Sequence, residues 1–371
     1  MTGIALNQNF VPRDYDVFLG LDVDKVNLAA TVVDHQMLMR SFKMPCRADH
    51  LLAYTRKHFP GKKVAFAYEA GPTGFGLYDD LTAAGHPCLV AAPSMIPTAP
   101  GQLVKTNRLG SKKIAESLRG GQLKSIHVPS VAYRHLRHLV QLRDTFVRQA
   151  VAFKNRIKAL LLYERIPFPA APGRPQWSGQ VMGELDQLPC ASPVRFKLDR
   201  LLSSLRFAQE QARQTTQEIH RFCREDLEIS RCMEFLMSIP GIGAIIASHL
   251  LARIGDWRQL TNVRQIGAFL GLTPMENSTG LSVSRGSITT MGDERLRNKL
   301  IQGAWAAIRQ DPELKEFFDH VCETHAHETA DRIAIVAVVR QLTTRIYAVL
   351  TQQRKYEVRK KTDAKNADAV L

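Results

Sequence analysis

The stretch from Ser238 to Arg297 constrains the fold of this chain more than any other. It contains Pro240-Gly241-Ile242-Gly243, followed by a segment rich in alanine, isoleucine and leucine. A proline ends the helix before it and the glycines permit a tight turn, so the pattern predicts a helix-hairpin-helix. The free N–H groups that begin the second helix suit phosphate, and such a motif holds a nucleic-acid backbone without reading its sequence. The alternative is a plain helical turn buried in a helical domain.

The second half of this stretch, residues 274–297, is too rich in glycine, serine and threonine to form a good helix. Its composition predicts a loop or a short hairpin. Three arginines lie near its hydroxyl groups in sequence, namely Arg285, Arg295 and Arg297. Hydroxyls beside arginines suit phosphate chemistry, because a hydroxyl can attack phosphorus while an arginine holds the charge. A polar surface loop is the simpler interpretation.

The charge balance indicates a polyanionic partner. The chain has 50 lysines and arginines against 35 acids, a formal net charge of +15 and a pI of about 9.7. A soluble chain this basic is best explained by binding to nucleic acid. The six cysteines are scattered without metal or redox spacing, and neither a signal peptide nor an apolar span of membrane length is evident. We therefore expect a cytoplasmic protein with reduced thiols and no membrane partner.

Two apolar segments near the N-terminus each end in a carboxylate. Residues 17–21 predict a buried strand running into Asp22, and residues 63–68 predict another that ends at Glu69, before a glycine turn. The first is followed by two hairpin strands, at 27–33 and 36–42, as at the start of an RNase-H-like domain. Carboxylates on adjacent strand ends can share one Mg²⁺. Alternatively, Glu69 complements the dipole of the following helix.

Further helices are predicted at 48–58 and 76–84, with a strand at 87–92 and a helix from about Gly110. This alternation favours an α/β domain with both faces of its sheet covered. We expect five regions along the chain. They are an arm (1–14), an α/β domain (15–130), a helical region with a proline-rich linker at 166–193 (131–230), a second helical domain (231–352) and a charged tail (353–371).

Two long amphipathic helices are predicted at 133–164 and 193–226 from apolar residues spaced by three or four. Such helices pair as an antiparallel or intermolecular coiled coil. Basic residues stand between the apolar positions of the first helix: Arg134, Arg137, Arg143, Arg148, Lys154, Arg156 and Lys158. They form either a solvated face or, as their excess over acids favours, a nucleic-acid surface.

These features together resemble the DEDD-type insertion-sequence transposases, relatives of the Piv DNA invertase, whose RNA-guided members are called bridge recombinases. The resemblance runs from Phe18 to about Leu350, and its most specific parts are LGLDVDK, AYEAGPTG, VKTNRLGSKKIAE, SIPGIG, FLGLTP with STG, and RGSITTMGDERLR. It implies an RNase-H-like (RuvC-like) N-terminal domain, coiled-coil helices and a helical C-terminal transposase domain. It also implies DNA, a structured noncoding guide RNA and a homo-oligomer, either a dimer or a tetramer.

The resemblance also assigns residues to a metal site. In that family an aspartate, a glutamate and two further aspartates bind Mg²⁺, and Asp22 and Glu69 match the first two acids. Lys105 begins a segment that matches the family pattern Lys-Thr-Asp-x-x-Asp-Ala, but Asn107 and Gly110 stand where the last two acids belong. Two carboxylates in place of four should weaken the hold on Mg²⁺. Asp24 and Glu116 are candidate replacements.

The family nucleophile is a serine that becomes covalently joined to DNA. Its place is held here by Thr279, directly before Gly280, with Ser278 as the substitute after a one-residue shift. The expected nucleic-acid contacts are Lys105, Arg108, Gly241, Gly243, Arg285, Arg295 and Arg297.

Three functions follow from these motifs. The leading one is a DNA transposase or site-specific recombinase that cleaves and rejoins DNA through a composite site of carboxylates and a hydroxyl. The second is a catalytically weakened relative that binds nucleic acid. The third is a metal-dependent junction nuclease that uses water as the nucleophile. The loop with hydroxyl groups beside arginines argues against this third function.

Overall fold

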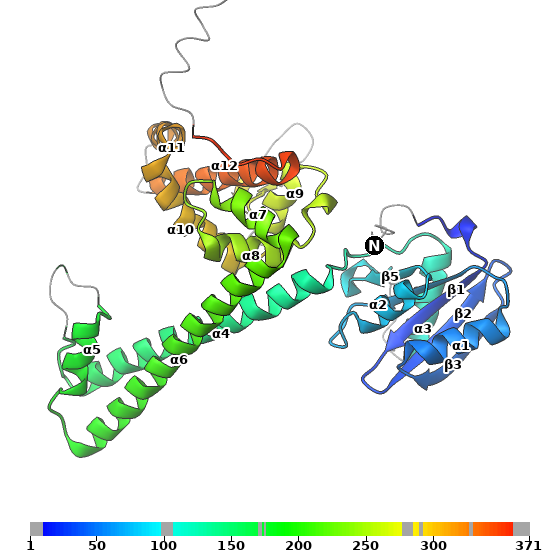
Figure 1. Cartoon of the computed structure of the whole chain (residues 1–371), viewed down its shortest axis with the longest axis horizontal. Coiled ribbons are helices and arrows are strands. Elements are labelled where there is room, and N and C mark those ends of the chain that lie inside the picture. Colours follow the sequence, from blue (N-terminus) through cyan, green and yellow to red (C-terminus); the bar gives the residue numbers. More distant parts are fainter. Residues whose placement is uncertain are drawn as a thin grey trace, which may run out of the picture. The chain divides into compact units, whose positions relative to one another are not determined.

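The computed structural model describes residues 10–97, 107–169, 173, 176–276, 285–288, 292–325 and 329–358 (Figure 1). It divides into two compact units, Met1–Val128 and Pro129–Leu371. The larger sheet belongs to the first unit, and the long helices belong to the second.

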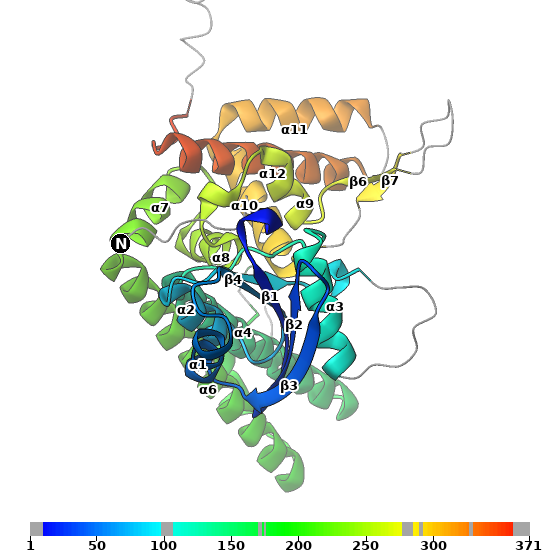
Figure 2. The same cartoon turned by 90° about the vertical axis from the view of Figure 1, so that its right-hand side faces the viewer.

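The first unit contains a five-stranded mixed sheet with strand order β3-β2-β1-β4-β5 (Figure 2). The strands are β1 (Val17–Val23), β2 (Asn27–Asp34), β3 (Met39–Pro45), β4 (Val64–Glu69) and β5 (Cys88–Ala91). The first three form an antiparallel meander, whereas β4 runs parallel to β1 and β5 runs parallel to β4. The predicted α/β class with a sheet covered by helices is confirmed.

Side chains of β1 and β4 alternate between two cores, because successive residues of a strand point to opposite faces. On one face, Leu19 and Leu21 pack with α1 (Ala48–His58) and α2 (Gly76–Ala83). On the other face, Phe18 packs with α3 (Asn107–Arg119). Gly20 allows α3 to lie directly on β1, since a Cβ at Gly20 would stand 2.2 Å from the backbone of both Ser111 and Ala115.

The second unit begins with two long helices, α4 (Val131–Tyr163) and α6 (Ser192–Glu225). The early part of α4 shares a core with the late part of α6, through Leu136 and Ile219. The late part of α4 shares another core with the early part of α6, through Ile157 and Leu202. The helices therefore form an antiparallel pair (Figure 1). Supercoiling of this pair stays a prediction.

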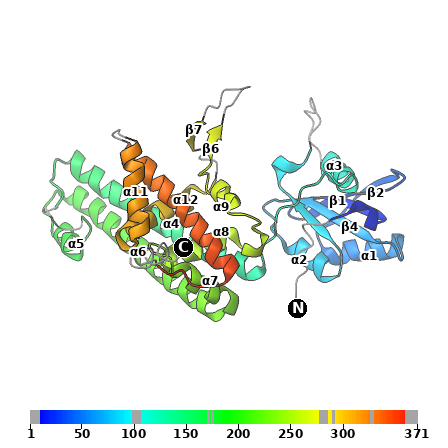
Figure 3. The same cartoon turned by 90° about the horizontal axis from the view of Figure 1, so that it is seen from above.

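The helices that follow share one hydrophobic core with the early part of α4 and the late part of α6, and the hairpin of β6 (Pro274–Glu276) and β7 (Arg285–Ile288) projects from them (Figure 3). The helices are α7 (Leu227–Met237), α8 (Ala244–Ile254), η3 (Trp257–Gln259), α9 (Val263–Phe269), α10 (Glu294–Gln310), α11 (Pro312–Thr324) and α12 (Ala330–Gln352). By length and composition, α12 could cross a membrane, a property that the sequence analysis did not recognise. Val338, Leu342 and Ile346 are nevertheless fully buried in the protein core, as in a core helix.

Several elements differ from the sequence predictions. The third strand begins at Met39 rather than Gln36, because Met37 adopts a left-handed conformation (φ 62°) in the turn. Helix α3 begins at Asn107 rather than about Gly110. The predicted linker at 166–193 contains a helix, α5 (Gly179–Asp186), which Ser178 caps by accepting from the Val181 N–H. The antiparallel pairing of β6 and β7 agrees with the predicted hairpin within the described residues.

Candidate active site

Asp22 and Glu69 lie side by side at one edge of the sheet. In the parallel pair of β1 and β4, Leu21 is opposite Tyr68, and Asp22 and Glu69 are the next residues of the two strands. Neighbouring strands are about 4.8 Å apart, so this register brings the two residues within reach of one small ion. Strand β1 continues to Val23, beyond the predicted end at Leu21, so Asp22 lies inside the strand.

Both carboxylates belong to the sheet face that α3 covers. Phe18 on β1, together with Ala65 and Ala67 on β4, packs against α3. Because side chains alternate along a strand, Asp22 and Glu69 share the face of these residues. The adjacent residues Leu21 and Tyr68 belong to the opposite core, which confirms the alternation.

Gly110 places the helix α3 directly against this edge. A Cβ at Gly110 would lie 2.6 Å from Oδ2 of Asp22. The next residue, Ser111, is buried and lies 2.8 Å from the Thr31 hydroxyl, a contact that fixes the helix to β2. Asn107 lies three residues earlier, in the first turn of α3. Asn107 and Gly110 therefore both lie on a helix that is held over Asp22.

The electrostatics of this edge suit a divalent cation. Burial raises the pKa of Asp22, and the negative charges of Glu69 and Asp24 raise it further. Within the described residues there is no cluster of three or more histidines, cysteines or acids that could hold a metal. Glu116, a candidate replacement, pairs instead with Lys112 at 3.8 Å. Two carboxylates fit Mg²⁺, which keeps several waters and often binds through one or two carboxylates and substrate phosphates.

The Pro-Gly-Ile-Gly turn joins α7 to α8 and packs against α10. Gly241 has a φ of 82°, and a Cβ there would stand 2.1 Å from the carbonyl oxygen of Gly303. Gly243, by contrast, is exposed and precedes the first turn of α8, and no described side chain caps this helix. Gly241 thus packs inside the protein, whereas at Gly243 no described side chain caps the first N–H groups of α8. The nucleic-acid role of both glycines stays a prediction.

The predicted nucleophile segment falls outside the described residues, as does Lys105. The segment contains Ser278, Thr279 and Gly280. Arg108 lies in the first turn of α3 and Arg285 begins β7.

The motif Gly292-Asp293 fixes the start of α10. A Cβ at Gly292 would meet the backbone of α9 at 2.5 Å, which explains the glycine. Asp293 caps α10 by accepting from the Leu296 N–H, and it pairs with Arg253 at 2.5 Å. Arg295 on the first turn is exposed.

Arg297, one turn further into α10, is only 8% exposed. Its Nη1 donates to the carbonyl oxygen of Leu270 at 2.8 Å. This contact joins α10 to the end of α9, so the structure favours a packing role for Arg297 over the nucleic-acid contact that the sequence predicted.

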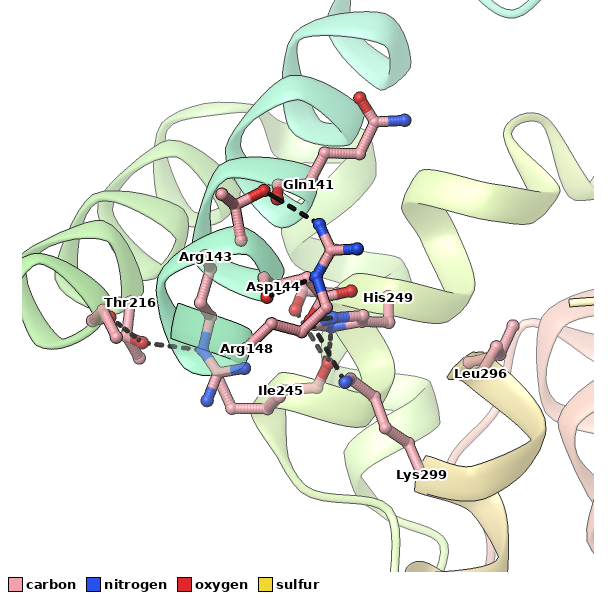
Figure 4. A network of polar contacts seen from close by, with 12 residues as sticks. Gln141, Arg143, Asp144, Arg148, Thr216, Ile245, His249, Leu296 and Lys299 are labelled. Carbon is pink, nitrogen blue, oxygen red and sulfur yellow. Dashed lines mark hydrogen bonds and ion pairs between the residues drawn. The ribbon is translucent and has the colours of Figure 1, made fainter. Parts of the chain in front are cut away.

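One polar network was missed by the sequence analysis. Asp144 on α4 is buried and lies 3.0 Å from Nε2 of His249 on α8 and 3.2 Å from Nζ of Lys299 on α10 (Figure 4). A sequence signal existed, because Asp144 continues the four-residue spacing of the buried Leu136 and Val140. An acid in an apolar stripe requires a partner inside the protein.

A mixed sheet with paired carboxylates on two neighbouring parallel strands is typical of an RNase-H-like class of domain, here in one chain with a helical domain. The comparisons with known proteins agree. Residues 19–164 match the model of the DEDD transposases of the IS110 type, and residues 233–319 match that of the transposase IS116/IS110/IS902 family.

Relatives extend this match along the chain. A putative transposase, y4qE, of Sinorhizobium fredii is 30% identical over 310 residues, which cover 79% of this chain and 72% of the relative. The transposase for insertion sequence element IS1111A of Coxiella burnetii is 25% identical over 254 residues, or 68% of each chain. The pilin gene-inverting protein of Moraxella bovis is 30% identical over 134 residues, 36% of this chain and 41% of that one. The chain belongs to the IS110 family of insertion-sequence transposases.

Proposed function

We propose that this transposase cleaves and rejoins DNA through a composite site. Asp22 and Glu69 hold the scissile phosphate, together with Mg²⁺, and a hydroxyl from the segment 277–284 attacks it. Thr279 is the proposed nucleophile and Ser278 the substitute. The observation that carries the proposal is the register of β1 and β4, which sets two carboxylates side by side on one face of the sheet.

The chemistry is a phosphodiester exchange. The hydroxyl oxygen forms one P–O bond, one P–O bond of the DNA breaks, and the proton of the hydroxyl passes to the leaving oxygen. Bound Mg²⁺ supplies charge neutralisation to the phosphate oxygens. The β-methyl of Thr279 crowds its approach, which predicts a slower attack than that of serine. In this proposal Arg285 balances the negative charge on the phosphate that the hydroxyl attacks.

We further propose that the protein acts as a homo-oligomer with a structured guide RNA. The support is the formal net charge of +15, which suits a polyanionic partner, and the family resemblance. The proposed acids and the proposed nucleophile lie far apart in sequence, and in this proposal they are brought together within one chain or between subunits.

A catalytically weakened, nucleic-acid-binding relative is the second candidate. It is favoured by the absence of a side chain at Gly110 and by the absence, among the described residues, of a group of three or more histidines, cysteines or acids that could hold a metal.

Incubation with the ends of the cognate element, followed by denaturing electrophoresis, distinguishes the candidates. A protein–DNA adduct supports the recombinase, free nicks support the water-using nuclease, and shifted bands on a native gel alone support the binder. Asp22→Asn and Glu69→Gln should abolish Mg²⁺-dependent cleavage. Asp49→Asn is the matched control, because Asp49 is an exposed acid of the same unit that pairs with Arg47.

Mass spectrometry of the adduct then tests the nucleophile. A phosphodiester on Thr279 supports the assignment, and one on Ser278 shifts the register by a residue. A modified residue outside the segment 277–284 overturns it.

A further inference from the structure

Positive charge is in excess around Asp144. This carboxylate is 8% exposed and is the acid on which His249 and Lys299 converge (Figure 4). The His249 ring is also held from its other side, since Nδ1 lies 2.7 Å from the carbonyl oxygen of Ile245. Nε2 of His249 and Nζ of Lys299 therefore both lie within hydrogen-bonding distance of the same carboxylate oxygen, Oδ1 of Asp144. Arg143 and Arg148 lie on the same helix nearby and bring two further positive charges.

Arg143 has little compensation inside the protein. It is half-buried, and among the described residues its one hydrogen bond runs from Nε to the neutral hydroxyl of Thr216, at 2.9 Å. Burial lowers the pKa of its guanidinium, and the charge of Asp144 offsets this only in part. The N–H groups on the two terminal nitrogens of Arg143 are thus available to donate hydrogen bonds to a ligand. A partly buried cation without an acidic partner is costly unless a ligand supplies the negative charge.

Arg148 has a similar set of partners. It is exposed, and it donates to the backbone carbonyl of Asp144 at 3.3 Å and to the Thr145 hydroxyl at 3.2 Å, both neutral groups. Lys299 is 21% exposed and approaches from α10. Figure 4 shows these three cations arranged around the buried pair.

Two arginines on the partner helix α6 have acidic partners instead. Arg213 is bound at both ends of its guanidinium by Glu210. Arg221 is bound by Glu218 and Glu225. The chain therefore neutralises these arginines on α6 with acids of the same helix and leaves those around Asp144 with neutral partners. Arg213 is therefore a suitable comparison for Arg143 and Arg148, because its charge is already balanced within the protein.

We propose that Arg143, Arg148 and Lys299 bind the sugar-phosphate backbone of a nucleic acid. The buried pair of Asp144 and His249 holds Lys299 in position beneath this surface. This inference rests on the proposed function, for which it names a contact surface. Guanidinium groups pair with phosphate in bidentate geometry, which suits the unused terminal nitrogens of Arg143. Contacts of this kind position a nucleic acid without reading its bases.

Binding is tested by fluorescence anisotropy of a short duplex DNA and of an RNA hairpin, between about 50 and 200 mM salt. The log–log salt slope on duplex DNA should fall by about 0.9 for each phosphate that a variant no longer neutralises. We expect this reduction for Arg143→Gln and for Arg148→Gln, whereas Arg143→Lys should keep the slope and weaken affinity, because the charge remains without the fork. Arg213→Gln is the matched control and should change neither quantity.

Arg148 is exposed, so its variant tests the surface even if Arg143→Gln fails to fold. A change on DNA alone or on RNA alone supports the surface and identifies which nucleic acid supplies the phosphates. Unchanged slopes for Arg148→Gln and folded Arg143→Gln on both probes overturn the inference, as would an equal change in Arg213→Gln. If the adduct assay failed but the arginine variants still showed the expected reduction in salt slope, the result would count against the proposed cleavage and leave the binding surface standing.

Discussion

Gly110 of α3 stands directly against the carboxylate of Asp22, since a Cβ at this position would lie only 2.6 Å from Oδ2. The contacted atom is the end of a short side chain, which can rotate, rather than backbone. Position 110 therefore faces the carboxylate of Asp22, so an acidic side chain there would lie beside the proposed metal site.

Restoring acids at this edge should strengthen metal binding. We expect Asn107→Asp with Gly110→Asp to raise Mg²⁺ affinity by about tenfold, or about 1.4 kcal/mol, because ligand charge tunes the affinity of such sites. Isothermal titration with Mg²⁺ measures it directly, and DNA cleavage should rise if the missing acids limit the chemistry. Gly110→Asn is the control of equal size. An equal gain in affinity from that neutral variant would contradict the role of charge.

The turn before α8 should tolerate substitution at one glycine and not at the other. Gly241→Ala combines a positive φ with a clash against the carbonyl oxygen of Gly303, so we expect a loss of more than about 2 kcal/mol in unfolding free energy. Gly243→Ala meets no described atom within 4 Å and has a φ of −84°, so it should cost less than about 1 kcal/mol. Urea denaturation compares the two. Equal stabilities would refute the packing of this turn on α10.

The close contact of β1 with α3 should depend on Gly20. In Gly20→Ala the new methyl would lie 2.2 Å from the backbone of Ser111 and Ala115, which must move away. We expect a destabilisation of about 3 kcal/mol or more and weaker binding of Mg²⁺, because α3 would shift from Asp22. The matched variant is Gly76→Ala, at the start of α2, which meets nothing within 4 Å. If thermal unfolding and metal titration failed to separate these variants, the helix contact would not matter for the site.

The stability contributed by Asp144 should depend on pH. Burial favours the neutral carboxyl, but hydrogen bonds and charges from His249 and Lys299 outweigh it, so the pKa of Asp144 is lowered on folding. A lowered folded pKa contributes stability that is complete above the unfolded value of about 3.9 and is lost as the pH falls through the folded value.

Asp144→Asn should therefore destabilise the protein by about 3 kcal/mol at neutral pH, and the difference from wild type should narrow below about pH 4. Urea unfolding at several pH values measures both effects. Asp319→Asn provides the comparison, because this exposed acid pairs with Lys315 on the same helix and should contribute less than about 0.5 kcal/mol. A difference independent of pH would contradict the ion-pair explanation.

The sequence by itself determined the strongly periodic elements and the family motifs. Apolar runs ending in Asp22 and Glu69 predicted the two strands that carry the carboxylates, and helix α1 has the predicted bounds of Ala48 and His58. Periodicity predicted α4 and α6 within two residues at each end. These features are local, because the spacing of apolar side chains specifies both the element and its buried face.

Only the tertiary structure decided which distant residues meet. The register of β1 and β4 placed Asp22 beside Glu69, and packing placed Gly110 over Asp22. Burial gave Arg297 a carbonyl partner at Leu270, although its sequence neighbourhood suggested phosphate. Asp144 met a histidine and a lysine that lie 105 and 155 residues away. Such pairs depend on how helices and strands pack, because a buried charge is stable only beside partners that the fold brings to it from elsewhere.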